Sequence, residues 1–147
     1  MAKSFNIESY RAELNAEIAR LESELATLRA NRYSKFWEIR DLQDKINELA
    51  LRRDPKFVCE LMWSDRHAYE VLRMESANRM VIRRLVATRT NVGEYYMSDA
   101  QDYTFESNPQ APEITIRLRK NGLWYAANNC DPFRITEEPY EYFDYSF

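Results

Sequence analysis

Histidine and cysteine, two common sources of a general base and a nucleophile, are scarce in this sequence of 147 residues. There is one histidine, His67, and there are two cysteines, Cys59 and Cys130. No nucleophile stands near His67 in the sequence, and Cys59 lies in an apolar segment, whereas a reactive thiolate needs a polarised and partly exposed site. We therefore expect His67 to be a solvated or capping residue, Cys59 a small core residue and Cys130 an ordinary loop thiol.

Cofactor and metal chemistry have as little support. Both the phosphate-binding loop and the dinucleotide fingerprint need several glycines at fixed spacing, and this chain has only Gly93 and Gly122. One histidine and two distant cysteines cannot complete a structural zinc site. The carboxylates show no metal-binding spacing on an expected helix. The sequence therefore predicts a protein that is not an enzyme and has no cofactor, metal or small-molecule substrate.

The last eleven residues, EEPYEYFDYSF, alternate acidic and aromatic side chains. An ordered, exposed array of this kind resembles a nucleic acid, with carboxylates in place of phosphates and rings in place of bases. The alternative is a terminal strand that buries one aromatic edge and leaves its acids in water. The first interpretation predicts a partner-binding surface that consists of Glu137, Glu138, Tyr140, Glu141, Tyr142, Asp144 and Tyr145.

A basic cluster supports a different hypothesis, direct binding of nucleic acid, because phosphate contacts need grouped cations. Its candidate contacts are Arg79, Arg83, Arg84 and Arg89. The chain as a whole has a pI near 5.3, and its last third, residues 91–147, carries ten acidic against four basic residues. The alternative is therefore that these arginines pair with acidic groups of their own domain or of a second subunit.

The segment that precedes these candidates, residues 7–53, has a heptad pattern and contains no Gly or Pro. A continuous helix of this length measures about 70 Å, too long to pack entirely on its own small domain. Its apolar stripe must then be buried in a coiled-coil homo-oligomer, or the segment must fold back as a helical hairpin near residues 31–34. The expected oligomer interface consists of Leu14, Ile18, Leu21, Leu25, Leu28, Ile39, Leu42, Ile46 and Leu49.

Three aromatic residues, Tyr33, Phe36 and Trp37, lie off this apolar stripe in the middle of the segment. One interpretation is that the following domain packs on them. The other is that they form an exposed anchor for a partner, since Trp and Tyr are enriched in binding hot spots.

The remaining residues predict a small mixed domain. Asp54 and Pro55 signal a second helix over residues 55–63, and Ser64 with Asp65 signals a third to about residue 77. Residues 80–90 predict a strand with an irregularity at Arg83 and Arg84. The alternative is that the preceding helix continues into this segment. Residues 114–119 and 123–128 predict a β-hairpin with a type I′ turn at Asn121 and Gly122. Weaker strand patterns cover residues 94–97, 103–106 and 133–136.

These patterns predict an α+β fold: a long N-terminal coiled-coil helix or helical hairpin, one or two further helices, and a small antiparallel sheet. Residues 1–53 would oligomerise and residues 54–147 would form the mixed domain. No membrane span or secretory signal is evident, so we expect a cytoplasmic protein that does not bind membranes.

In function, we expect a protein-interaction module that forms a homodimer or higher oligomer and binds a basic or nucleic-acid-binding protein target. The more specific version is an acidic inhibitor of a nucleic-acid-handling enzyme, of the kind viruses use against host defences. The alternatives are a direct nucleic-acid binder or a structural assembly subunit.

Overall fold

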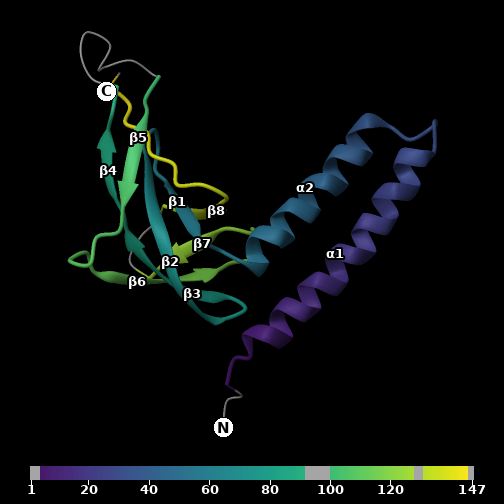
Figure 1. Ribbon diagram of the computed structural model, residues 1–147, viewed down its shortest axis with the longest axis horizontal. Helices are drawn as coiled ribbons and strands as arrows, with labels where there is room; N and C mark the ends of the chain where they lie inside the picture. The colour runs from purple at the N-terminus through teal and green to yellow at the C-terminus, as the bar shows by residue number, and fades with distance from the viewer. Residues whose placement is uncertain (1–3, 92–99, 128–130, 146–147) are drawn as a thin grey trace. The chain divides into compact units, whose positions relative to one another are not determined.

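The computed structural model describes residues 4–91, 100–127 and 131–145, and the chain divides into two compact units (Figure 1). Unit 1, Met1–Asp54, is helical, and unit 2, Pro55–Phe147, is built of β-strands. Each unit has its own core, and each is described by itself below.

Unit 1 is a helical hairpin of α1 (Ile7–Ala30) and α2 (Phe36–Arg53). The Asn6 side chain caps α1 by accepting a hydrogen bond from the Ser9 N–H at 3.0 Å. Asn31 ends α1 in an extended conformation, and the Glu38 carboxylate accepts a hydrogen bond from the Lys35 N–H where α2 begins. Polar side chains thus satisfy backbone groups at the start of each helix.

The expectation of one continuous coiled-coil helix is wrong, because the chain turns at residues 31–35. The physical reason lies in the two cations of the heptad stripe, Arg32 and Lys35, which a continuous coiled coil would place in its core layers. The turn leaves both at the hairpin tip and packs the apolar stripe of α1 on that of α2. The resulting core contains Ile18, Leu21, Leu25, Ile46 and Leu49, with Leu14, Ile39, Leu42 and Ala50 packed against it.

Unit 2 is a closed antiparallel barrel of six strands in the order β1-β2-β3-β6-β7-β8 (Figure 1). A second, two-stranded sheet of β4 and β5 is inserted between β3 and β6. The bounds are β1 (Phe57–Leu61), β2 (Arg66–Ser76), β3 (Arg79–Arg84), β4 (Val86–Arg89), β5 (Tyr103–Glu106), β6 (Glu113–Leu118), β7 (Trp124–Ala126) and β8 (Phe133–Thr136).

The helices expected over residues 55–77 are absent from the structure, which has β1 and β2 there. Short apolar runs do not distinguish a buried helix from a buried strand, and here pairing decides. Val58 lies opposite Tyr69 in the β1–β2 ladder and opposite Ile135 in the β1–β8 ladder, and it is fully buried. Asp65 begins no helix: its carbonyl accepts a hydrogen bond from the Met62 N–H in the turn between the strands.

The strand expected over residues 80–90 is two strands that belong to different sheets. The ladder of β2 and β3 ends with Tyr69 opposite Arg84, and Leu85 separates β3 from β4. The irregularity expected at Arg83 and Arg84 therefore precedes the point where the chain leaves the barrel. Strands β5 and β8 occupy two of the three weaker strand ranges, and residues 94–97 lie outside the described residues.

The β6–β7 hairpin forms where the sequence predicts it, but its turn differs. Arg117 pairs with Tyr125, and the Arg119 N–H donates to the Leu123 carbonyl, so the loop has three residues instead of two. Gly122 has a φ of +83°, and no described non-glycine residue has a positive φ. A type I′ turn needs two such residues, whereas a three-residue loop with one left-handed glycine needs only Gly122.

The fold class expected from the sequence is therefore wrong: two helices precede a six-stranded barrel and a small second sheet, in place of a long coiled coil with a small sheet. Neither described helix combines the length and apolar character that a membrane crossing requires.

Candidate functional site

The most concentrated group of ionisable side chains in the described residues lies on the inner face at one end of the barrel. Glu60 pairs with His67 on β2 and with Phe133 on β8, and Tyr69 pairs with Arg84 on β3. Residues directly opposite each other in antiparallel strands point to the same face. That face is the interior, because Phe133 is buried there. Pairing of β1, β2, β3 and β8 thus brings together residues that are separate in the sequence.

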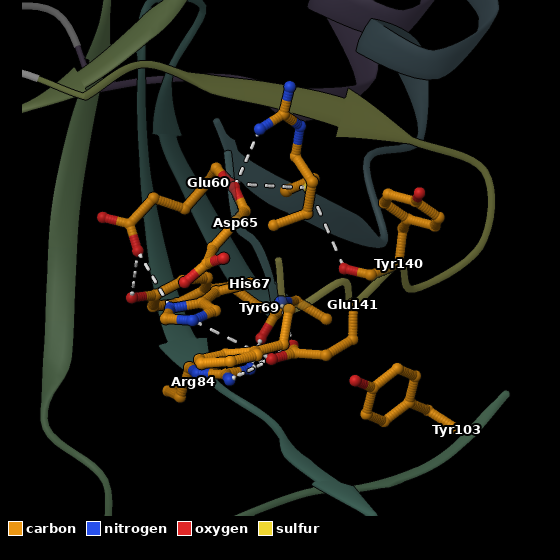
Figure 2. Close-up of polar contacts among 12 residues, drawn as sticks. Glu60, Asp65, His67, Tyr69, Arg84, Tyr103, Tyr140 and Glu141 are labelled. Atoms are coloured by element: carbon orange, nitrogen blue, oxygen red, sulfur yellow. Dashed lines mark hydrogen bonds and ion pairs between the residues drawn. The ribbon is translucent and has the colours of Figure 1, made fainter. Parts of the chain in front are cut away.

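Glu141, from the C-terminal segment, completes this polar cluster (Figure 2). Its carboxylate accepts hydrogen bonds from the Ala68 N–H at 2.9 Å and from both terminal nitrogens of Arg84 at 2.9 and 2.7 Å. His67 lies between two carboxylates, with Nδ1 3.6 Å from Glu60 and Nε2 4.0 Å from Glu141. The Tyr69 hydroxyl donates to Glu60 at 3.2 Å.

The pKa values of three groups in and beside the cluster are raised. Interaction with Glu60 raises the pKa of His67, which favours an imidazolium over a free base. Burial raises the pKa of Tyr69 to about 12, and the neighbouring Glu60 charge adds to this effect. Burial likewise raises the pKa of the Cys59 thiol on β1 to about 11, so the thiolate that a nucleophile requires does not form near neutral pH.

The cluster holds the C-terminal segment on the barrel. Tyr142 and Arg66 exchange backbone hydrogen bonds of 2.8 and 2.9 Å, and the Asp144 N–H donates to the Asp65 carboxylate at 2.8 Å. Arg84 and Glu141 form a bidentate ion pair in which their side chains are 30% and 10% exposed. These contacts attach the C-terminal segment to β2 and β3, and we interpret the polar cluster as a structural lock.

The seven residues expected to bind a partner are divided by this lock. Glu137, Glu138 and Tyr140 are exposed. The Glu141 carboxylate is paired with Arg84, and the Tyr142 backbone bridges that of Arg66. The Tyr145 hydroxyl accepts a hydrogen bond from Arg89 at 3.2 Å. No continuous exposed array forms across the described part of this segment.

The four arginines expected to contact nucleic acid do not share one surface role. Arg83 forms an ion pair with Glu70 at 2.8 Å, and Arg84 pairs with Glu141. Arg89 donates to Asn91 as well as to Tyr145. Among the described residues, Arg79 has one ion-pair contact, a long one of 3.9 Å with Glu75, and it lies opposite Arg117 of β6.

The nine residues expected at an oligomer interface line the inside of the hairpin. Eight belong to its apolar core or pack against it, and Leu28 is half-buried near the turn. The hairpin supplies an intramolecular partner for the stripe, so the length argument for a second chain no longer applies. The structure of a single chain does not test the oligomerisation that the sequence predicted through this stripe.

The hairpin tip carries the aromatic residues that lie off the stripe. Tyr33, Phe36 and Trp37 are 77%, 75% and 54% exposed. Cations lie over two of these rings: Arg32 is 4.9 Å from the Tyr33 ring centroid and Lys35 is 5.2 Å from that of Trp37. We name these five residues the basic aromatic tip.

A hollow of about 350 Å³ lies on the outer face of β6 and β7, and sequence reasoning did not identify it as a site. The alternation of ITIRLR does place Arg117 and Arg119 on the face opposite Ile116, which was a usable signal. What the sequence did not show is that Tyr125 joins them. The hollow is lined by Thr115, Arg117, Arg119, Tyr125, Ala126 and Ala127.

No group of three His, Cys, Asp or Glu side chains suited to a metal ion occurs among residues 4–91, 100–127 and 131–145. Cys130, which we expect to be an ordinary loop thiol, lies outside the described residues. Comparison of the chain with known protein families, with curated proteins and with solved structures gave no match.

Proposed function

We propose that this chain is a non-enzymatic interaction module that binds another protein through the basic aromatic tip. The observation that carries the proposal is the exposure of Tyr33, Phe36 and Trp37, three large aromatic side chains within five residues. Burial of an exposed aromatic side chain is worth a few kcal/mol, and aromatic and Arg residues dominate hot spots. Contiguous exposed apolar surface rimmed by charge is typical of a binding site.

The construction of unit 1 supports this role. The interhelical core keeps the two helices together, and Arg29 donates to Gln43 across them at 3.2 Å close to the tip. A rigid hairpin holds its end residues in place, which lowers the entropy lost on binding. The tip lies about 27 Å from the end of α2, at 1.5 Å per residue over its 18 residues.

Charge at the tip specifies the chemistry of the partner. Arg32 and Lys35 flank the aromatic rings, and no ion pair to either is found among the described residues. The fitting partner is a protein with an apolar pocket rimmed by carboxylates. Acidic residues on the first turns of α2, Glu38 and Asp41, disfavour an anionic bilayer as the alternative surface.

Photocrosslinking tests this proposal directly. The full chain carrying p-benzoylphenylalanine in place of Phe36 is expected to crosslink a specific protein in extracts of its source cells. Once that protein is purified, Trp37→Ala is expected to weaken binding about 30-fold or more in calorimetry, the effect of a hot-spot aromatic. Both substituted side chains are exposed, so the hairpin core is unaffected.

The matched control replaces other exposed aromatic residues. Trp63, which is 91% exposed, and Tyr140, which is 52% exposed, lie in unit 2. Trp63→Ala and Tyr140→Ala are expected to leave the affinity unchanged. Equal losses in the tip and control variants would contradict the proposal, as would tip-dependent binding to phosphatidylserine vesicles without any crosslinked protein.

The mass of the free chain in solution tests the remaining prediction of oligomerisation. Light scattering is expected to give the 17.6 kDa of a single chain, because the leucine stripe is used within the hairpin. A dimer that Leu21→Lys abolishes, while helix content is retained, would instead assign the stripe to an intermolecular interface.

A further inference from the structure

The outer face of β3, β6 and β7 carries cations that the proposed interaction at the hairpin tip does not use. Arg117 on β6 and Arg119, just after the end of β6, line the hollow, and Lys120 follows them in the turn. Within the described residues, no carboxylate lies within 4 Å of a charged nitrogen of Arg117 or Lys120. None of the six lining residues is acidic. This face is therefore locally basic although the chain has a net charge of −3.

Two of these cations face each other across neighbouring strands. Arg79 on β3 pairs directly with Arg117 on β6, so their side chains leave the sheet on the same face. Like charges directly opposite in a sheet are destabilising. Glu75 offers Arg79 only the contact of 3.9 Å, and the Arg79 Nε atom is buried without a hydrogen-bond partner. An anion between the two guanidinium groups would relieve this repulsion.

A stacking platform lies beside the facing arginines. Tyr125 is opposite Arg117 in the β6–β7 ladder, and the Arg119 guanidinium lies 4.1 Å from its ring centroid. The Asn121 side chain donates to the Tyr125 hydroxyl at 2.7 Å and fixes the ring. Single-stranded nucleic acids are bound by bases that stack on aromatic rings or on guanidinium planes. The exposed side of Arg119 presents such a plane.

We infer that this face binds single-stranded nucleic acid, with phosphates at Arg79 and Arg117 and a base stacked on the Arg119–Tyr125 pair. The hollow of about 350 Å³ is large enough for one nucleotide unit. A single-stranded nucleic acid fits this face better than an acidic peptide does. The carboxylates of a peptide would satisfy the arginines but would leave the Arg119–Tyr125 pair without a base to stack on it. This site differs from the arginine cluster expected from the sequence and shares only Arg79 with it.

Fluorescence anisotropy of a labelled 20-nucleotide oligothymidylate tests this inference with the full chain. Binding is expected to weaken as salt rises, and Arg117→Gln is expected to reduce the slope of log K against log [salt] by about 0.7, the contribution of one phosphate contact on a single strand. Tyr125→Leu is expected to weaken binding about tenfold through the loss of stacking.

Arg134→Gln is the matched control, since Arg134 is an exposed arginine on β8 that does not line the hollow. It is expected to change neither the slope nor the affinity. Thermal unfolding of every variant checks that the barrel is intact. If Tyr125→Leu unfolds the barrel, Arg117→Gln and Arg119→Gln still test the site, because both positions are exposed.

Three outcomes would overturn the inference. The first is no binding of the oligonucleotide at low salt, or equal weakening by Arg117→Gln and Arg134→Gln. The second is thymidine monophosphate binding as tightly as the strand, which would make the ligand a free nucleotide. The third is equal competition by polyglutamate at the same charge concentration, which would show that stacking contributes nothing.

Discussion

Replacement of Glu141 by Gln tests whether the polar cluster locks the C-terminal segment to the barrel. The glutamine has nearly the same shape, but it removes the negative charge that meets the two terminal nitrogens of Arg84. Arg84 would then remain partly buried with a weaker acceptor. The substitution isolates the charge because the Ala68 N–H can still donate to the amide oxygen.

The size of the effect follows from exposure and hydrogen bonding. Removal of one partner from a fully buried ion pair costs about 3–5 kcal/mol, and a hydrogen bond to a charged group contributes about 1.5–3 kcal/mol. Arg84 is 30% exposed, so water solvates part of the unpaired guanidinium. We therefore expect the free energy of unfolding of the barrel to fall by about 2 kcal/mol.

Urea unfolding followed by tryptophan fluorescence measures this loss. Trp37→Phe and Trp63→Phe in the background leave Trp124, which is buried in the barrel, as the only tryptophan. With a slope near 1.5 kcal/mol per molar urea, the midpoint is expected to fall by about 1.3 M. Glu138→Gln, an exposed carboxylate on the same segment, is the control and should change the free energy by less than about 0.5 kcal/mol.

A loss below about 0.5 kcal/mol for Glu141→Gln would refute the lock. So would equal losses for Glu141→Gln and Glu138→Gln. A double-mutant cycle with Arg84→Gln separates the ion pair from general effects, and a coupling energy near zero would show that the two charges do not stabilise each other.

Three further predictions concern other parts of the chain. Because the folded-state pKa of His67 is raised, the stabilising contribution of this residue is fully present below its ordinary pKa of 6.5 and is lost as pH rises through the raised pKa. In urea unfolding between pH 5.5 and 8.5, the wild type should lose stability relative to His67→Gln as pH rises. Parallel stability profiles of the two proteins would exclude the effect. Leu21→Ala should lower the stability of the hairpin by about 3 kcal/mol in urea unfolding followed by helical circular dichroism, with Glu22→Ala as an exposed control, and similar effects of the two would contradict the hairpin core. Gly122→Ala should cost about 1 kcal/mol through its left-handed backbone alone, since no atom lies within 4 Å of the added Cβ, and Gly122→Asn should cost less; the reverse order in thermal unfolding would contradict this reasoning.

Heptad spacing and charge contain much of the information for unit 1. The apolar stripe is nearly symmetric about the turn, and Arg32 and Lys35 are unfavourable in the core of a continuous coiled coil. Both alternatives for residues 7–53 used the same leucines, and the expected fold class failed in part because pattern alone could not choose between an intermolecular and an intramolecular partner. The two cations favour the hairpin, because the turn keeps both of them out of an apolar core.

The barrel shows where local pattern fails. Residues 57–76 were expected to be helical because short apolar runs fit either period, and the helix-cap signal at Ser64 and Asp65 is also a turn signal. Pairing with β2 and with β8, which follows about 75 residues later, decides that Val58 and Glu60 belong to a strand. The helix prediction failed because the energetic preference for a strand comes from contacts between residues that are distant in the sequence.

The length of the β6–β7 loop decides which side chains of β7 face the barrel interior. A two-residue loop would shift the register by one and place Trp124 on the face of Arg119 and Tyr125 inside. The observed three-residue loop buries Trp124 and places Tyr125 beside Arg117. The physical reason for this register is that burying the larger and more apolar Trp124 ring in the barrel interior is more favourable than burying Tyr125.

By itself, the sequence determined the apolar stripe of the helices, the alternating faces of β6, the location of the Gly122 turn and the scarcity of histidine and cysteine. These features depend on periods of two to four residues or on composition, which local physics controls. The tertiary structure alone decided that Arg84 meets Glu141, which is 57 residues away, and that Arg79 faces Arg117 beside Tyr125. Such pairings arise because closing a barrel brings distant strands into register, and no local pattern encodes that register.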